Sequence, residues 1–290
     1  MPVPMPVAFF GHGSPMNTLE LNRHTARWRD FGGMFAAAEH SRSMNEAGLY
    51  AKPRAILCIS AHWAPLGGST EVQVSEHPEM IHDYMGFPRE LQEFRYPASG
   101  ATNVALRVAD LLRPMCAPKP IARTTRWGVD HGTWSVLAHV FPNADVPVAQ
   151  LSIDLNRPAA WHLEAGRMLT ELRLEGVLIV GSGNIVHNLG RMNMSAGDQP
   201  APEAARFNDY IVDALRNNDE EALCKYVEHP DVRFAVPTPE HFLPLLYVVG
   251  ARNGQSPGII TDGYDYGSIS MTSLFYGVNS DKHQPAIAAY

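Results

Sequence analysis

The stretch VAFFGHGSPMN, residues 7–17, lies almost at the start of the chain and combines an apolar run with a Gly-His-Gly sequence. Its first residues form a short apolar run, which is typical of a buried β-strand. The run ends in Gly11, His12 and Gly13. Glycine permits sharp backbone geometry and close approach by other groups. We therefore expect a buried strand that turns at its end and directs the imidazole of His12 into a cleft.

Further segments of the chain resemble this first strand, and several are continuously apolar, as strands covered on both faces are. The expected strands span residues 6–11, 55–63, 71–75, 146–154 and 176–184. Helical patterns, with apolar residues three to four positions apart, lie between them at 101–115, 158–176 and 202–217. Strands that alternate with helices predict an α/β fold with a central, mostly parallel or mixed sheet and helices on both faces.

The remainder of the chain contains no internal repeat and no linker, so we expect a single domain over residues 1–290, with a frayed tail after about residue 279. The late stretch GYDYGSISMTSLFYG, residues 263–277, alternates polar and apolar residues. This pattern predicts an antiparallel strand at an edge of the sheet. Residues 85–100 are rich in proline and glycine and are expected to form a long connection of the kind that often carries function.

Composition limits the classes of partner. The chain has 290 residues, with 23 Lys and Arg against 30 Asp and Glu, a net charge of −7, and no block of basic residues. This argues against nucleic acid, whose binding needs a basic patch. No apolar run is long enough to span a membrane, and the first residues show no secretory signal. Three widely spaced cysteines indicate a reducing compartment. We therefore expect a cytoplasmic monomer or homodimer.

Four histidines occupy positions where an α/β sheet binds ligands, which is outside the carboxyl ends of its strands. His12, His62 and His187 each follow or end an expected strand, and His241 opens an apolar helix. Converging imidazoles suit Zn, Fe, Cu or Ni. No pair shows HxxxH or HExxH spacing, and a single histidine after a strand is more often structural. The shared edge of the sheet nevertheless predicts a metal site at the carboxyl ends of the strands.

A fifth histidine, His131, lies in WGVDHGTWSVLAHVFP, just before a helix expected to begin at about Thr133. The positive end of a helix dipole disfavours the cationic imidazole. His131 could therefore serve as a neutral base or as a hydrogen-bond donor. Taken alone, a partly exposed residue in a helix-start turn is the simpler interpretation.

Nine segments together resemble the class III extradiol ring-opening dioxygenases, and within them the branch of 4,5-DOPA dioxygenase-like enzymes. The segments are GHGSPMN, SAHW, IHDYMGFP, YPASG, WGVDHGTW, QLSID, GSGNIVHNL, TPEHFLPLLY and GSISMTSL. They occur in the order of the family and span nearly the whole chain, which makes the resemblance far more specific than any one motif.

The resemblance implies a non-haem metal site, with Fe(II) expected for activity. His12 and His62 match metal ligands of the family. His241 matches the third ligand of this branch, while the adjacent Glu240 offers the carboxylate that wider class III enzymes use. His187 matches the acid–base histidine and could also reach the metal, particularly Zn(II). A set of neutral imidazoles binds Zn(II) as well as Fe(II), so the purified protein could carry zinc.

The substrates implied by the resemblance are a DOPA-like or related catechol and O₂, and the product is a muconic semialdehyde. His187 would accept a catechol proton and later return one. His131 matches a histidine near the substrate and oxygen, where a hydrogen bond would stabilise charge.

Two other classes of function are compatible with the histidines alone. A zinc hydrolase would use the same residues to lower the pKa of a bound water. A non-catalytic member of the fold would bind a metal, peptide or small ligand without turnover. O₂ uptake separates both from a dioxygenase. The identity of the catechol and the ring bond that is cleaved stay open.

Overall fold

Eight strands form one sheet in the computed structural model, which describes residues 3–35, 49–116 and 119–278. The order across the sheet is β4-β3-β5-β2-β6-β1-β10-β7, and β8 and β9 form a separate two-stranded hairpin. The strand bounds are β1 Val7–Gly11, β2 Ala55–Ser60, β3 Glu71–Gln73, β4 Ala122–Thr124, β5 Val148–Leu151, β6 Val177–Gly183, β7 Gly258–Thr261, β8 Tyr264–Asp265, β9 Ile269–Ser270 and β10 Ser273–Tyr276. The expected frayed tail lies outside the described residues.

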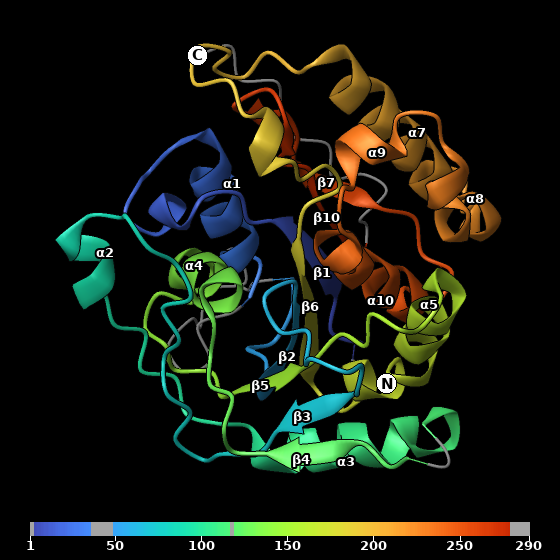
Figure 1. Ribbon diagram of the computed structural model, residues 1–290. Helices are drawn as coiled ribbons and strands as arrows, with labels where there is room; N and C mark the ends of the chain where they lie inside the picture. The colour runs from blue at the N-terminus through green and yellow to red at the C-terminus, as the bar shows by residue number, and fades with distance from the viewer. Residues whose placement is uncertain (1–2, 36–48, 117–118, 279–290) are drawn as a thin grey trace.

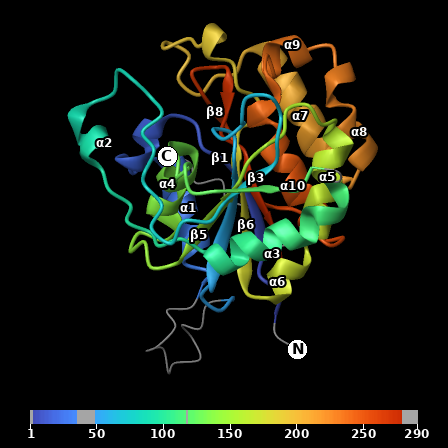
Figure 2. The same cartoon turned by 60° about the horizontal axis from the view of Figure 1, so that its bottom comes forward.

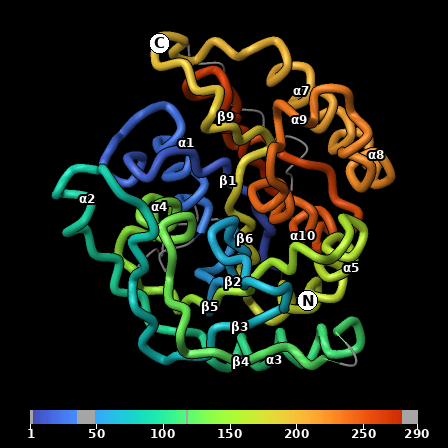
Figure 3. The backbone as a smooth tube through the Cα atoms, in the orientation of Figure 1, coloured from blue at the N-terminus to red at the C-terminus, as the bar shows by residue number. Residues whose placement is uncertain are grey.

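The sheet is mixed around a parallel centre. β5, β2, β6 and β1 run parallel to one another, whereas β10 is antiparallel to β1 and β7 is antiparallel to β10. On the other side β3 pairs antiparallel with β5 and parallel with β4. Figure 3 shows β1 (blue) near β6 (yellow), its parallel partner, although the two strands are far apart in the sequence. The predicted mostly parallel or mixed sheet is confirmed.

Helices cover both faces of this sheet (Figures 1 and 2), which confirms the second part of the fold prediction. α1 and α4 lie on one face, and α3, α5 and α10 lie on the other. The helix bounds are α1 Arg23–Gly32, α2 Arg89–Glu93, α3 Thr102–Leu112, α4 His131–Val140, α5 Ala159–Met168, α6 Glu171–Leu174, α7 Pro202–Arg216, α8 Glu220–Cys224, α9 Val232–Ala235 and α10 Leu243–Ala251. Within the described ranges, none of the helices is both long and apolar enough to cross a membrane.

The centre of the sheet is apolar because its side chains pack against helices on both sides. In β2, Leu57 and Ile59 join the core under α3, α5 and α10, while Ile56 and Cys58 join the core under α1 and α4. All six residues of β2 are buried. Full burial of each large aliphatic side chain stabilises the fold by about 1.5–3 kcal/mol. The run AILCI at 55–59 is therefore continuously apolar, and the strand ends at Ser60, three residues before the expected end at 63.

The late stretch 263–277 differs from its expectation in one respect. β10 is antiparallel, as predicted, but it lies between β1 and β7, so its predicted position at the edge is wrong. All four residues of β10 are buried. The alternating pattern reflects two elements, since the first part of the stretch forms the β8–β9 hairpin and only the last part enters the large sheet.

The expected helix over 158–176 is divided into α5 and α6. The amide of Leu169 bonds to the carbonyls of both Ala165 and Gly166, which tightens the last turn of α5. The guanidinium of Arg173 in α6 then donates to the carbonyls of Met5 and Ala251, at 2.7 Å each. The expected long connection at 85–100 likewise contains the short helix α2.

Candidate metal centre

The register of the parallel strands brings two of the histidines to the same level. β1 and β6 pair Gly11 with Gly183, and β2 and β6 pair Ser60 with Ser182. The amide of His12 continues this ladder by donating to the carbonyl of Gly183 at 3.0 Å. His12 and His62 thus leave the carboxyl ends of β1 and β2, the two parallel strands that flank β6. Gly13 adopts a φ of +60°, which turns the chain away after His12.

The third histidine comes from η5, a 3₁₀ turn at Pro239–His241 that precedes α10. Its backbone lies directly against β6, because the amide of Asn184 donates to the carbonyl of His241 at 2.9 Å. A Cβ atom on Gly183 would stand 2.1 Å from that carbonyl oxygen. Glycine at the end of β6 is therefore what allows His241 to approach the sheet.

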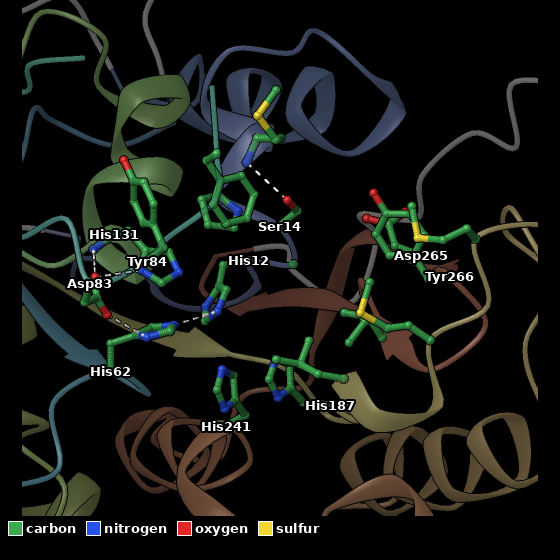
Figure 4. A pocket seen from close by; sticks show the side chains of 18 residues that line it. His12, Ser14, His62, Asp83, Tyr84, His131, His187, His241, Asp265 and Tyr266 are labelled. Carbon is green, nitrogen blue, oxygen red and sulfur yellow. Dashed lines mark hydrogen bonds and ion pairs between the residues drawn. The ribbon is translucent and has the colours of Figure 1, made fainter. Parts of the chain in front are cut away.

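The three imidazoles of His12, His62 and His241 form a nearly regular triangle (Figure 4). Their ring centroids are 5.1, 5.3 and 5.2 Å apart for the pairs His12–His62, His12–His241 and His62–His241. One ring nitrogen from each lies within 4.8 Å of the others. The Nε2 atoms of His12 and His62 are only 3.2 Å apart. Two nitrogens bound to one ion at about 2.1 Å lie about 3 Å apart when they are adjacent ligands.

A hydrogen bond at Nδ1 of His12 leaves its Nε2 available to bind a metal ion. The Ser182 hydroxyl donates to the carbonyl of Gly132 at 2.5 Å, so its oxygen accepts from Nδ1–H of His12 at 3.0 Å. That tautomer leaves the lone pair of His12 on Nε2. Such a partner on the outer nitrogen is the usual way in which proteins orient a metal-binding histidine.

His62 and His241 have the same arrangement with carboxylates. His62 Nδ1 lies 2.9 Å from an oxygen of Asp83, and His241 Nδ1 lies 3.1 Å from Oε1 of Glu240. His241 Nε2 is buried and has no hydrogen-bond partner among the described residues. A buried polar atom without a partner is costly. A cation bound between the three Nε2 atoms would satisfy it, and the donor set fits a transition metal.

Burial keeps two of these rings neutral. It lowers the pKa of His12 and of His241 well below the usual value, and the neighbouring imidazoles lower both further. Burial also lowers the pKa of His62, but the hydrogen bond to Asp83 and nearby negative charges outweigh it, so the net shift is upward. Two lone pairs at 3.2 Å repel, so a proton or a cation has to lie between His62 and His12. A metal ion would replace that proton.

Asp83 also binds His131, the first residue of α4. One carboxylate oxygen lies 2.7 Å from His131 Nδ1, and the other is the partner of His62. Burial raises the pKa of Asp83, but the two histidines lower it by more, so the carboxylate stays ionised. Burial lowers the pKa of His131 despite this partner.

The helix α4 begins at His131, two residues before the expected Thr133, because Asp130 caps it by accepting from the amide of Thr133 at 3.1 Å.

His187 and Glu240 lie beside His241. The rings of His187 and His241 stack with centroids 3.4 Å apart and an angle of 7° between their planes. Ligand atoms of His187, Glu240 and His241 lie close enough together to form one group, and those of His12, His62 and His241 form another. His241 is the residue that the two groups share. Burial lowers the pKa of His187 to about 4, so this ring is neutral near pH 7.

A cavity of about 550 Å³ opens over the cluster, and all five of these histidines line it. Its walls are mostly apolar, with Met16, Tyr84, Phe87, Leu189, Met192, Met194, Tyr266 and Ile269 among them. Cavities of about 300–1,000 Å³ with a few convergent polar groups are typical of small-molecule sites. The cavity is thus large enough for a substituted aromatic ring above the histidines.

Sequence reasoning missed Asp83 and Ser182 as partners of the site histidines. Asp83 stands in IHDYMGFP, one of the segments on which the family resemblance rests, and that was its only signal. Ser182 lies in β6 between two glycines, and nothing in that pattern marks it as a partner of a histidine. The structure also adds Tyr84 as a ring that lies edge-on to His131, with centroids 5.5 Å apart.

The chain is similar to known proteins over nearly its whole length. A family model described as the catalytic LigB subunit of aromatic ring-opening dioxygenase matches residues 6–278. The chain is 42% identical over 277 residues to "4,5-DOPA dioxygenase extradiol" of Escherichia coli (strain K12), covering 94% of this chain and 95% of that protein. It is 34% identical over 272 residues to the protein of the same name from Beta vulgaris, covering 91% and 96%.

A solved structure shows the same fold. The crystal structure of an uncharacterized protein from Escherichia coli K12 aligns with a TM-score of 0.76 at 38% identity, covering 94% of this chain and 100% of that one. The family model spans most of the described residues, and both named relatives match nearly end to end. The chain therefore belongs to the LigB family of aromatic ring-opening dioxygenases and is an extradiol ring-cleaving dioxygenase.

Proposed function

We propose that this dioxygenase is metal-dependent and that His12, His62 and His241 hold the ion. The observation that carries the proposal is the common orientation of the three rings. Each Nδ1 has an acceptor, so each Nε2 lone pair points into one space, and His241 Nε2 has no other partner among the described residues. The position of Glu240 on the Nδ1 side of His241 supports His241 over Glu240 as the third ligand.

Fe(II) is the proposed metal for activity. When bound, a non-haem Fe(II) supplies open coordination positions for a catechol and O₂ and passes electron density between them. Three neutral imidazoles also suit Zn(II), which binds such donors more tightly by the general affinity order. The zinc form is expected to be inactive as a dioxygenase, since zinc has no redox chemistry.

The proposed substrate is a catechol whose ring lies in the apolar cavity between the histidines and the aromatic wall. Tyr84 and Phe87 supply that wall, and their own rings contact each other edge-to-face at 5.2 Å between centroids. Both hydroxyl oxygens of the ring would then face the histidine triangle. The proposed product is the muconic semialdehyde formed by cleavage beside the diol.

His187 and His131 take different roles in this proposal. His187 lines the cavity next to His241, where its neutral ring can accept a proton from a catechol hydroxyl and later return one. Because its ring stacks on that of His241, we give His187 a direct bond to the metal only as a secondary role. His131 keeps Nδ1 on Asp83, so only Nε2 is left to hydrogen-bond to charge on the substrate or on oxygen.

O₂ uptake by anaerobically reconstituted protein tests the proposal. We expect the Fe(II) form to consume one O₂ per catechol and to give a yellow ring-opened product, while the metal-free and Zn(II) forms consume none. Absence of uptake with every catechol in a broad panel, at one bound iron per chain, would contradict the proposed function.

The H187Q variant tests the base. We expect it to retain metal and to lose turnover by a factor of about 10²–10⁴, as removal of a general base does. H77Q is the matched control, because His77 is exposed and does not line the cavity. Full activity of H187Q would remove His187 from the mechanism.

A further inference from the structure

The cavity carries an unusual distribution of charge. Among the described residues that line it, Asp83 and Asp265 carry negative charge, and no lysine or arginine is present. Both oxygens of Asp83 are engaged by His62 and His131. Asp265 lies at a different part of the wall, across the cavity from Asp83 in Figure 4. It is the cavity carboxylate that the metal centre does not use.

A rigid hairpin holds Asp265 in this position. Asp265 ends β8 and pairs with Ile269 of β9, and Ile269 in turn forms a bridge with His187. The amide of Ser270 donates to the carbonyl of Val186 at 2.9 Å, which adds a second link. Asp265 is therefore fixed relative to the catalytic segment, as a group that selects substrates has to be.

The carboxylate of Asp265 has no hydrogen-bond partner among the described residues. His24 Nε2 lies 3.7 Å from Oδ1, beyond hydrogen-bond distance. That nitrogen accepts from Arg23 Nε at 3.2 Å, so it carries no proton toward Asp265. The guanidinium of Arg23 donates instead to the carbonyl of the preceding Tyr264 at 3.4 Å. Arg23 itself pairs with Asp198 at 2.9 Å. Among the described residues, no hydrogen-bond donor reaches the Asp265 carboxylate, and 27% of the side chain is exposed.

We propose that Asp265 is the anionic end of a subsite that selects catechols whose side chain bears an ammonium group. The inference rests on the proposed function, because it requires the catechol ring to bind at the histidines. A charge-assisted hydrogen bond to a carboxylate favours such a cation. A side-chain carboxylate would meet Asp265 with no lysine or arginine on the described wall to balance it.

The neighbouring aromatic ring strengthens the assignment. Tyr266 lines the same cavity and follows Asp265 directly, with a left-handed φ of +55° that only a minority of residues other than glycine adopt. An aromatic face attracts an ammonium ion within about 6 Å. The volume of about 550 Å³ also exceeds what an unsubstituted catechol needs, which leaves room for a side chain.

Three catechols that differ in the charge of the side chain test the subsite. They are 2-(3,4-dihydroxyphenyl)ethylamine, 4-ethylcatechol and 3-(3,4-dihydroxyphenyl)propionate. With the Fe(II) enzyme we expect kcat/KM to fall in that order, with the difference mainly in KM. Anaerobic calorimetry should give the same order of dissociation constants without turnover.

Variants then assign the preference to one residue. D265N should reduce the amine-to-neutral ratio of kcat/KM about tenfold, and Asp265→Lys should invert the preference toward the propionate. D262N is the matched control, because Asp262 is an exposed acid on the same segment that does not line the cavity, and its ratio should equal that of the wild type.

The outcomes separate the two proposals. Cleavage of all three catechols without preference, or an unchanged ratio in D265N, would overturn the subsite and leave the dioxygenase mechanism standing. A similar loss of ratio in D262N would show a long-range charge effect and would also overturn the subsite. No cleavage of any of the three, 4-ethylcatechol included, would count against the proposed function itself.

Discussion

At the scale of single residues, Asp83 joins the two halves of the site. One of its oxygens holds Nδ1 of His62, a proposed metal ligand, and the other holds Nδ1 of His131. Because the carboxylate accepts from both rings, it sets both tautomers and leaves both Nε2 atoms facing the cavity. Outer partners of this kind tune ligand orientation and basicity.

We expect the D83N variant to bind Fe(II) about 10–100-fold more weakly than the wild type, because an amide can accept from only one of the two histidines. Turnover at saturating metal should also fall, since His131 loses its fixed tautomer. Anaerobic metal titration and O₂ uptake measure the two effects separately. E79Q, at an exposed position in the same segment, serves as the control. Equal metal affinity in D83N and E79Q would refute this role.

At the scale of elements, the site depends on the contact between the end of β6 and η5. The carbonyl of His241 accepts from the amide of Asn184, and the absence of a side chain on Gly183 makes that approach possible. Asn184 also donates through Nδ2 to the carbonyl of Ser270 at 2.8 Å, which ties the same turn to β9. The geometry of the third ligand is thus set by backbone packing.

We expect G183A to displace η5, because the added Cβ would stand 2.1 Å from the carbonyl oxygen of His241. Overpacking of this kind costs about 1–3 kcal/mol of folding stability. Metal affinity should fall as well. G33A provides the comparison, since Gly33 is exposed at the end of α1, and its free energy of unfolding should change by less than about 0.5 kcal/mol. Wild-type stability and metal binding in G183A would show that η5 does not depend on this contact.

At the scale of the whole molecule, buried histidines make the fold sensitive to acid. His162 is fully buried in α5, and burial lowers its pKa to about 4 from the ordinary 6.5. Between these two values the unfolded chain binds a proton that the folded chain does not, so stability decreases as the pH falls from 6.5 toward 4. Below about pH 4 both states are protonated and this contribution stops changing.

The full effect of His162 is about 3 kcal/mol, since one pKa unit corresponds to about 1.4 kcal/mol. We expect H162Q to flatten the loss of the free energy of unfolding between pH 6.5 and 4, whatever its stability at pH 7. Urea unfolding at several pH values measures both slopes. Parallel curves for H162Q and the wild type would show that His162 does not carry this sensitivity.

The sequence predicted the centre of the molecule better than its borders. The continuous apolar run at 55–59 identified β2, since a strand covered on both faces has no alternation. β4 and β7 were not expected, because each has only three or four residues and lies at an edge of the sheet. The partners of β10 could not be read from the chain either, since pairing across the sheet depends on tertiary packing.

The same division holds for the candidate site. His12 and His62 each follow an apolar strand, so their position at the carboxyl edge of the sheet could be anticipated from the chain. The register that brings them to one level is seen only in the structure. Asp83 could not be anticipated, because its place depends on the path of a connection that is bound to the site through the bridge between Met80 and Val129. Asp265 likewise needs the β8–β9 hairpin, which the alternating pattern of its stretch did not distinguish from a single strand.

The central claim is that three Nε2 atoms hold one metal ion, and an anaerobic Fe(II) titration tests it most directly. We expect one ion per chain in the wild type. We also expect one ion in E240Q, whose amide oxygen can still accept from His241 Nδ1, and a large loss of affinity in H241N. No binding by the wild type, or loss of the ion in E240Q with full retention in H241N, would contradict the account.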